Sequence, residues 1–449
     1  MFIKRKLLSY LTLLLIAYSN CQGMDIENNH ESKLVLESRN CLVINFWPFG
    51  DYSKTVTEIP HYNFFMIADK SIASDQLETL QPYFKKIILI DNYFSSGKLE
   101  IETLKINQEY SLDSIIAFDE FDLLRAARLR EHLKITTGQS YESALAFRDK
   151  FIMKSYLRNS NIQVPPHAKI TCALEAIEFF SANPLMILKP IRGAGAEKTI
   201  VIKSLEELNS TIASNLFFGH YHFSNLIAEK YIHGEMYNIN GFVLNNEIVF
   251  MWPNKYYNTC LDMVHGKIMS HYTLSPDNPM VPRLMDYTRK VLTLLPTPKD
   301  TAFHLEVFHT EKDELFFCEI ASRLCGGLLT TEWESSFGIN PVHEDFLIQA
   351  GSTQAWDIER KFSSVPKMIS GHVEIPSKIG VLRSLPESLP FAWVKKYEKK
   401  RQVNDVVNSV KSIMDRVAQI SFVADSESQF ISRLSELTEW FEKNTKWEQ

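Results

Sequence analysis

The sequence of 449 residues lacks the features that mark several large classes of protein. Its six cysteines include no CxxC pair, a scatter that argues against a zinc site and against a disulfide framework. The formal net charge is −6, and beyond the N-terminus the only basic run is Lys395–Arg401, which we interpret as a solvated helix face. The sequence therefore gives no indication of a nucleic-acid partner. The cysteines are Cys21, Cys41, Cys172, Cys260, Cys318 and Cys325.

A segment long and apolar enough to cross a bilayer is also missing. The apolar run Leu7–Ala17 is too short to span one. It follows Lys4–Lys6 and precedes small and polar residues, so residues 1–23 have the order of a secretory signal. Two alternatives stay open: Cys21 is the acylated residue of a lipoprotein, or translation starts at Met24.

The first half of the chain alternates short apolar strands with amphipathic helices. The runs CLVINF, NFFMIA, KIILI and SIIAF between Cys41 and Phe118 predict four buried strands, and apolar residues from Leu123 to Leu133 fall at helical spacing. This alternation predicts a small parallel sheet with helices on its faces. No GxGxxG follows the first strand, so we expect a Rossmann-like domain over residues 34–147 without a dinucleotide.

The pattern changes near residue 148. FRDKFIMKSYLRNSNIQVPPH predicts a helix that ends at Pro165-Pro166, and Ser204 with Glu207 predicts a capping box. The run from Ile227 to Phe250 predicts two strands with a turn at Asn245-Asn246, and the aromatic-rich stretch Asn254–Pro282 predicts a long loop over a site. Further on we expect a helix near Pro341–Ala350 and a terminal helix over Glu427–Lys443.

The stretch from His304 to Gly327 carries the most information. Apolar runs flank the polar loop Glu311–Glu314, so we expect a β-hairpin with a four-residue connection. This register pairs Thr310 with Leu315, Phe308 with Phe317, and Glu306 with Glu319. Like charges directly opposed on neighbouring strands destabilise a sheet, and a bound Mg²⁺ would remove that conflict. The alternative is two solvated glutamates on an exposed strand face.

A glycine-containing loop, IRGAGAEKT, joins the predicted strands LMILKP and TIVIK. It is not a P-loop, because Glu197 stands where GxxxxGK[ST] requires glycine. Such a loop can still fold over phosphates with backbone N–H groups, and a plain hairpin turn is the alternative. Lys189, at the end of the preceding strand, places a positive charge beside it and favours a phosphate partner.

In its order of motifs the chain resembles the ATP-grasp enzymes, and among them the carboxylate–amine ligases. The resemblance covers most of residues 113–352. The segments that carry it are DSIIAFDEFDLLRAARLREHL, ITTGQSYESALAFRDKFIMKSYL, LKP with RGAGAEKT, EKYIHGE, HLEVF and CEIASRLCGG.

This resemblance implies roles for the matching residues. Lys150 and Lys189 would hold the ATP phosphates, Glu235 the ribose hydroxyls, and Arg323 the transferred phosphate or acyl phosphate. Glu306 and Glu319 would bridge Mg²⁺, or Mn²⁺ in its place. The lid loop would consist of Gly193, Ala194, Gly195 and Ala196, and the adenine-side segment of Glu229, Lys230 and Ile232.

The sequence departs from the family pattern at Ala321. Many relatives place asparagine there as a further metal ligand. Either the second metal ion is held more weakly here, or Ser322 or water replaces the asparagine as a ligand. His304 could face substrate or be a structural histidine. We do not expect any single residue of the long loop to contact the acceptor amine, and we expect core positions for the tryptophans. These weaker candidates are Tyr256, Tyr257, Asn258 and His265, with Trp333 and Trp356.

The resemblance implies an α/β fold with an α+β core: a Rossmann-like N-terminal domain, a two-lobed ATP-grasp core over residues 148–364 with its lid lobe at about 165–235, and a small C-terminal domain over 365–449. It implies an ATP- and Mg²⁺-dependent ligase that activates a carboxylate as an acyl phosphate and joins it to an amine, with amino acids or small peptides as substrates. A nucleotide-binding protein with reduced or lost catalysis is the alternative. We expect no nucleic-acid partner and no membrane span, and a homodimer is the default. Because ATP is kept in the cytosol, we favour a cytoplasmic location. The signal-like residues 1–23 would imply export if they are genuine, so the location stays open.

Overall fold

The computed structural model describes residues 38–45, 52–59, 61–71, 74–214, 217, 225–352 and 363–449. The signal-like segment 1–23 and Trp356 lie outside them. Residues Arg39–Gln449 form one compact unit. None of the helices in the described residues has the length and apolar character that a bilayer span requires.

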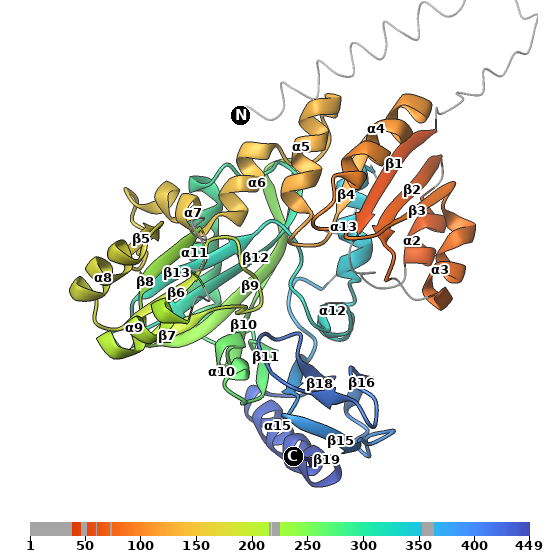
Figure 1. The fold of residues 1–449 in the computed structure, drawn as a ribbon. Coiled ribbons are helices and arrows are strands. Elements are labelled where there is room, and N and C mark those ends of the chain that lie inside the picture. The colour runs from red at the N-terminus through yellow and green to blue at the C-terminus, as the bar shows by residue number, and fades with distance from the viewer. Residues whose placement is uncertain are drawn as a thin grey trace, which may run out of the picture. The chain divides into compact units, whose positions relative to one another are not determined.

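The N-terminal sheet is parallel, as predicted, with the strand order β3-β2-β1-β4 (Figure 1). Alternate residues of its strands enter two different cores. Leu42 and Ile44 pack with α4 and α5 on one face, whereas Cys41 and Val43 lie in the core that includes α13 on the other. Burial on both faces explains why these strands are apolar without alternation. The elements are β1 (Arg39–Asn45), α2 (Tyr52–Glu58), β2 (Tyr62–Asp69), α3 (Ser74–Leu80), the short 3-10 helix η1 (Gln81–Tyr83), β3 (Lys86–Ile90), α4 (Lys98–Tyr110), β4 (Ser114–Ala117) and α5 (Leu123–Leu133).

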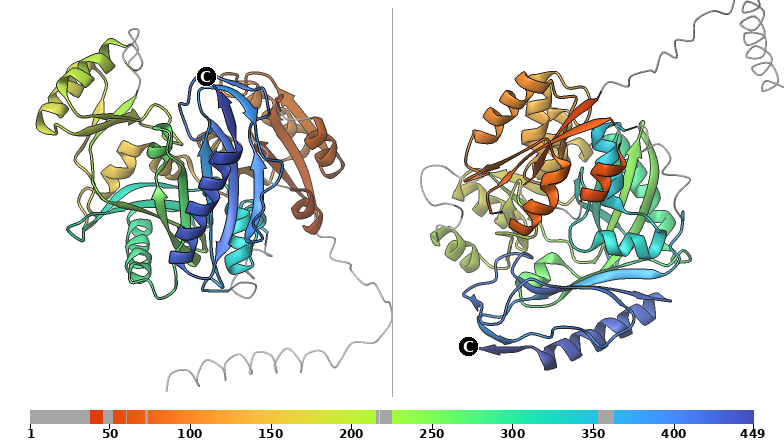
Figure 2. Two further views of the ribbon diagram at one scale, coloured as in Figure 1. Left: turned by 90° about the horizontal axis from the view of Figure 1, so that it is seen from below. Right: turned by 90° about the vertical axis from the view of Figure 1, so that its right-hand side faces the viewer.

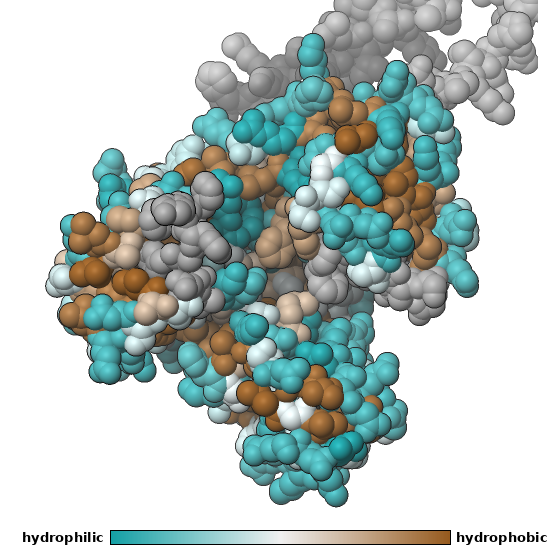
Figure 3. All heavy atoms as spheres, viewed as in Figure 1, coloured by the Kyte–Doolittle hydropathy of each residue, from teal (hydrophilic) through white to brown (hydrophobic). Residues whose placement is uncertain are grey.

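The outer surface of this region keeps apolar side chains. Ile101 and Leu104 on α4 are 53% and 39% exposed. Figure 3 shows hydrophobic side chains gathered over α4 and α5.

A small antiparallel sheet with the order β5-β8-β6-β7 follows. Helices α8 and α9 bury apolar side chains against it. The Ser204 hydroxyl caps α9 by accepting from the backbone of Glu207, but the Glu207 carboxylate accepts from Lys203 N and not from Ser204 N as a full capping box requires. The elements are β5 (His167–Ile170), α8 (Ala173–Ala182), β6 (Met186–Pro190), β7 (Ile200–Ile202), α9 (Leu205–Ala213) and β8 (Leu226–Lys230).

The central sheet has the order β13-β12-β9-β10-β11-β14-β18-β16, and neighbouring strands pair antiparallel. Strands β14, β18 and β16 belong to residues 365–449, so the C-terminal part of the chain continues this sheet. Its strands are β9 (Glu235–Leu244), β10 (Glu247–Asn258), β11 (Met269–Thr273), β12 (Thr301–His309), β13 (Leu315–Ala321), β14 (Ile369–Pro376), β16 (Val394–Lys399) and β18 (Arg416–Ala424).

Helices pack on this sheet, among them the predicted terminal helix α15, which lies along β14 and β18 (Figure 2). Trp333 on α12 is buried among Phe242, Phe250 and Phe337, which confirms its core position. The remaining elements are α6 (Tyr141–Arg148), α7 (Lys150–Leu157), α10 (Cys260–Val264), α11 (Met280–Leu294), α12 (Leu329–Phe337), α13 (Pro341–Ala350), β15 (Gly380–Ser384), β17 (Val406–Val407), α15 (Glu427–Asn444) and β19 (Lys446–Glu448).

Four predicted elements were wrong. The basic run Lys395–Arg401 is not a helix face, because most of it lies in strand β16. The stretch Asn254–Pro282 is not a long loop, because β10 continues to Asn258 and α10, β11 and the start of α11 follow. The run from Ile227 to Phe250 forms three strands, since the chain leaves the small sheet after β8 and enters the central sheet at β9. The helix expected from residue 148 to the prolines is interrupted at Asp149 and ends at Leu157.

Candidate active site

The hairpin β12–β13 brings Glu306 opposite Glu319 as predicted, although the register nearer to the turn differs. The predicted pairs Thr310–Leu315 and Phe308–Phe317 are wrong, because Thr310 belongs to the turn, where its N–H donates to Glu314 O at 2.9 Å. Cys318 is then an extra residue in β13, a β-bulge that restores the register of the glutamates. The pairs that the structure forms beside the turn are His309–Leu315, Phe308–Phe316 and Val307–Phe317.

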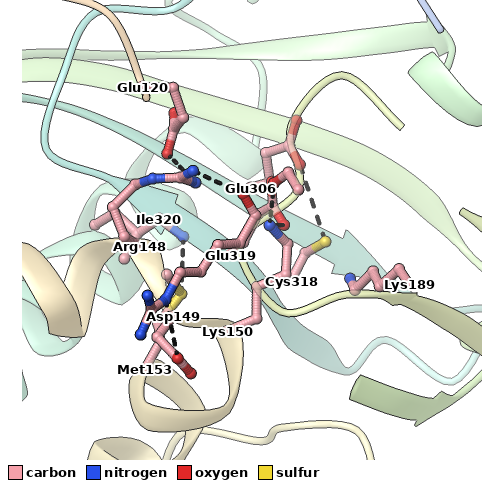
Figure 4. A network of polar contacts seen from close by, with 12 residues as sticks. Glu120, Arg148, Asp149, Lys150, Met153, Lys189, Glu306, Cys318, Glu319 and Ile320 are labelled. Carbon is pink, nitrogen blue, oxygen red and sulfur yellow. Dashed lines mark hydrogen bonds and ion pairs between the residues drawn. The ribbon is translucent and has the colours of Figure 1, made fainter. Parts of the chain in front are cut away.

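A lysine compensates the charge of Glu319. Lys150 Nζ lies 3.0 Å from Glu319 Oε2 and also donates to Gly193 O at 2.8 Å (Figure 4). Burial alone would raise the pKa of Glu319, but the charges of Lys150 and Lys189 outweigh burial and hold this pKa well below its usual range. The carboxylate is therefore ionised, and its side chain remains 31% exposed.

The partners of Glu306 are a phenol, an imidazole and, on its other oxygen, the Cys318 thiol at 3.9 Å. Tyr256 donates its hydroxyl to Glu306 Oε1 at 2.8 Å, and His304 Nε2 lies 3.5 Å from the same oxygen. Tyr256 reaches this position because β10 extends through a stretch that the sequence suggested to be a loop. His304 faces the same carboxylate, as its spacing of two residues from Glu306 along a strand allows.

Two buried lysines share one buried glutamate beside the hairpin. Glu229 lies 3.1 Å from Lys189 Nζ and 3.0 Å from Lys154 Nζ. Burial raises the pKa of Glu229, yet the two lysines lower it to about 2, and the same contact raises the pKa of Lys189 above its usual range. One carboxylate between two ammonium groups leaves an excess positive charge, and this charge attracts an anion. Sequence reasoning missed Lys154, although its spacing of four residues from Lys150 places both lysines on one face of α7.

Arg323 forms part of a second cluster, in which two guanidinium groups share one carboxylate. Its Nε donates to the Glu120 carboxylate, which also accepts from Arg148 Nη1 at 2.8 Å. Burial raises the pKa of Glu120, but Arg323 and Arg148 hold it below its usual range. Glu120 and Arg148 were not predicted as site residues, although both lie in segments that carry the family resemblance.

The break between α6 and α7 sets the positions of Arg148 and Lys150. Asp149 takes an extended conformation and caps α7, where its carboxylate accepts from Phe151 N at 3.2 Å and from Ile152 N at 3.1 Å. Lys150 is thus the first residue of α7, and its backbone N–H donates to Ile191 O at 3.1 Å. The cap therefore directs two basic side chains toward the hairpin.

The glycine-containing loop joins β6 to β7 within the small sheet. It is tied to α6 and α7 where Arg148 Nη2 donates to Arg192 O at 2.7 Å and Lys150 to Gly193 O. Positive φ angles occur at Gly195, and also at the non-glycine residues Ala196 and Lys198. The lid loop over the phosphates, predicted to consist of Gly193, Ala194, Gly195 and Ala196, stays a prediction.

The predicted adenine-side segment lies at the end of β8 and the start of β9. The side chain of Glu229 points into the lysine cluster, whereas Lys230 is exposed and its N–H donates to Pro166 O at 2.8 Å. Ile232 is half-buried between the strands. Glu235 is bound by Lys255 Nζ at 2.6 Å and accepts from Tyr237 at 2.9 Å. Their predicted contacts with adenine and ribose stay predictions.

The remaining loop candidates have no demonstrated part in the site. Tyr257 is 50% exposed, and Asn258 ends β10. His265 follows α10.

The carboxylates of the hairpin fit a magnesium ion. Glu306 and Glu319 pair across neighbouring strands and offer hard oxygen ligands, which Mg²⁺ prefers, and Glu319 is partly accessible. Ala321 stands opposite His304 in the same hairpin and contributes no ligand atom from its side chain.

Another cluster in the described part of the chain has the composition of a metal site: His271, Glu332 and His372. Its hydrogen bonds argue against a metal. Asn238 Oδ1 accepts from Asn240 and Asn254, so the Asn238 amide N–H faces His271 Nδ1 and makes this nitrogen an acceptor. His271 Nε2 therefore carries the proton and donates to Glu332 at 3.0 Å. A metal-bound histidine would instead donate its second nitrogen to an acceptor.

Comparison with known proteins identifies the fold and the domain family. Residues 147–275 match the ATP-grasp domain family. The chain is 25% identical over 342 residues to the L-arginine-specific L-amino acid ligase of Bacillus subtilis, an alignment that covers 74% of this chain and 79% of the relative.

The solved structures that share the fold include an L-amino acid ligase and a ribonucleotide synthase. The L-amino acid ligase from Bacillus licheniformis superposes with a TM-score of 0.69 at 13% identity, covering 90% of this chain and 98% of that one. A carboxyaminoimidazole ribonucleotide synthase from Aspergillus clavatus, solved with ATP, superposes with a TM-score of 0.65 at 15% identity, covering 91% and 99%. The α/β fold with an ATP-grasp core is thereby confirmed.

Proposed function

We propose that this chain, which carries an ATP-grasp domain, is an ATP-dependent ligase that joins the carboxylate of one amino acid to the amine of another amino acid or small peptide. The observation that carries the proposal is the distribution of charge around the hairpin. Lys189 and Lys154 share Glu229, and Arg323 and Arg148 share Glu120, so four cationic side chains gather beside the hairpin. A triphosphate and an acyl phosphate are the anions that such a site would hold.

In the proposed reaction a carboxylate oxygen attacks the γ-phosphorus of ATP, and ADP leaves. The amine then attacks the carbonyl carbon, and phosphate leaves as the amide forms. Mg²⁺ held by Glu306 and Glu319 would neutralise charge on the phosphate oxygens. Lys150 and Lys189 would hold the phosphates, because phosphoryl transfer depends mainly on positioning and charge neutralisation.

Arg323 has a separate task in this proposal. A guanidinium can bind a carboxylate or a phosphate through two parallel hydrogen bonds. Arg323 and Arg148 lie on the two sides of Glu120, which holds both guanidinium groups in place. We assign Arg323 to the reacting carboxylate and then to the acyl phosphate.

The substrate class rests on the relatives. Both a curated relative and a solved structure are L-amino acid ligases, and the first is L-arginine-specific. We therefore propose L-amino acids as donor and acceptor. For the donor we make no narrower choice.

Two further parts of the proposal concern the whole protein. We propose a cytoplasmic site of action, because the reaction consumes ATP. We also propose a homodimer, since Ile101 and Leu104 leave an apolar surface on α4. Light scattering that gives the mass of one chain in solution would contradict the dimer.

The test is a screen of the full chain with Mg²⁺, ATP and pairs of L-amino acids, with ADP release and dipeptide formation measured by mass spectrometry. The proposal expects at least one pair to give dipeptide and ADP in equal amounts. Glu319→Gln should abolish both products, whereas Glu311→Gln in the hairpin turn should not. ATP binding without turnover for any pair would instead favour a nucleotide-binding protein without catalysis, as the missing metal ligand at Ala321 suggests.

A further inference from the structure

The glycine-containing loop contacts a residue far away in the sequence. Ile413, in the segment between β17 and β18, donates its backbone N–H to Gly195 O at 3.4 Å. Its side chain also lies directly over Gly195, because a Cβ atom added there would stand 3.0 Å from Ile413 Cγ1. Gly195 has a φ of +59°, so it combines a left-handed backbone with a close contact.

Several hydrogen bonds hold the segment that carries Ile413. The Asp415 carboxylate accepts from Lys411 N at 2.8 Å and from Ser412 N at 3.2 Å. Arg416 donates to Ile413 O at 3.2 Å and lies 3.2 Å from the buried carboxylate of Glu374 on β14. The position of Ile413 is therefore fixed by the central sheet.

Ile413 also contacts the base of the candidate site. Its side chain packs against a cluster that includes Met236, Tyr256 and Cys318. Tyr256 binds Glu306 directly, and Cys318 is the bulge residue of β13, next to Glu319. The Ile413 side chain thus contacts the glycine loop and also the apolar cluster that includes a residue of the carboxylate hairpin.

We propose that Ile413 is a positioning residue that holds the glycine loop closed over the reacting groups, so that the C-terminal part of the chain controls the access of water. This inference rests on the proposed function, because an acyl phosphate is the species that needs protection from water. The loop is tied to α6 and α7 at its first residues by Arg148 and Lys150, and Ile413 is the contact at Gly195. Without the isoleucine side chain the middle of the loop loses its apolar contact with the central sheet.

The first test measures coupling in the full chain. Ile413→Ala should raise the amount of ADP formed per amide from about one to at least about three, since water would reach the acyl phosphate. Ile413→Val should restore a ratio close to that of the wild type. The control is Met414→Ala, because this neighbouring side chain is 50% exposed, and its ratio should not change.

The second test does not require catalysis and so separates this inference from the proposed function. Hydrogen exchange of the backbone amides of residues 192–199 is measured without substrates. Ile413→Ala should accelerate exchange in this loop at least about tenfold relative to wild type and to Met414→Ala, with exchange in β12 and β13 unchanged. Equal exchange in all three proteins would overturn the inference, whatever the screen of amino-acid pairs shows. If loop exchange is faster in Ile413→Ala but no amino-acid pair gives amide, the role of Ile413 in holding the loop stands and the proposed ligase activity is rejected.

Discussion

Replacing Glu229 with glutamine removes the carboxylate that two buried lysines share, and the structure gives the size of the effect. Glu229 is 5% exposed and lies within 3.1 Å of both Lys154 Nζ and Lys189 Nζ. Its pKa falls from 4.5 to about 2. Because one pKa unit corresponds to about 1.36 kcal/mol, the net shift, in which the lysines outweigh burial, corresponds to about 3 kcal/mol of stability that depends on the ionised carboxylate.

We therefore expect Glu229→Gln to lower the free energy of unfolding by about 3 kcal/mol at pH 7, as found when one partner of a buried ion pair is removed. The assay is urea unfolding followed by fluorescence and circular dichroism. Glu247→Gln on an exposed strand end serves as the control, with an expected change below about 0.5 kcal/mol.

The dependence on pH tests the cause. A group whose pKa is lowered on folding stabilises the folded state above its unfolded pKa, and this stability is lost as the pH falls through the folded pKa. The difference between wild type and Glu229→Gln should therefore be largest above about pH 4.5 and should shrink toward pH 2. A difference below about 1 kcal/mol at pH 7, or one that does not change with pH, would refute the reasoning.

Three further predictions concern the site and its surroundings. Lys150→Met removes the ammonium that binds Glu319 and Gly193 O, so the KM for ATP should rise about 10- to 100-fold. Lys169→Met, at an exposed position, is the control and should leave the KM unchanged. An unchanged KM in Lys150→Met would exclude Lys150 from phosphate binding. Tyr256→Phe removes the hydrogen bond to Glu306, and the Mg²⁺ concentration for half-maximal activity should rise about tenfold, as for other residues that orient metal ligands; an equal requirement in both proteins would contradict this. Burial lowers the pKa of His372, but Glu332 and Glu374 overcome burial and raise it to about 10, so His372 stabilises the fold below pH 6.5 and loses this contribution as the pH rises through about 10. In urea unfolding, His372→Gln should therefore be less stable than wild type at pH 6 and should lose less stability than wild type between pH 7 and 10. If the free energies of unfolding of the two proteins change equally with pH, His372 is not ionised in the folded chain.

The parts of the fold that the sequence predicted well are those with a local signal. The parallel sheet followed from four apolar runs and α5 from helical spacing, and α13 and α15 lie where helices were predicted. The elements between Asn254 and Pro282 were missed, because β10 and β11 are rich in polar and aromatic residues. Their polar side chains, such as Asn254 and His271, are buried, and both of these form hydrogen bonds with Asn238 on β9, which no local pattern indicates.

For the site, the pairing of Glu306 with Glu319 was predicted from a hairpin whose turn was misplaced by one residue. The bulge at Cys318 compensated that error, and bulges have no reliable sequence signal. Lys154 and Glu120 were not recognised, and Tyr256 was named only as a weak candidate for the acceptor amine, since each comes from a different element and meets the hairpin only in the folded chain.

The most direct test of the central claim follows the oxygen atoms of the substrate. An amino acid labelled with ¹⁸O in its carboxylate is supplied with ATP, Mg²⁺ and an acceptor amino acid, and the released phosphate is analysed by mass spectrometry. If the carboxylate is activated as an acyl phosphate, each phosphate should carry one ¹⁸O atom for each amide formed. Phosphate without ¹⁸O, released while amide accumulates, would contradict the mechanism proposed for this site.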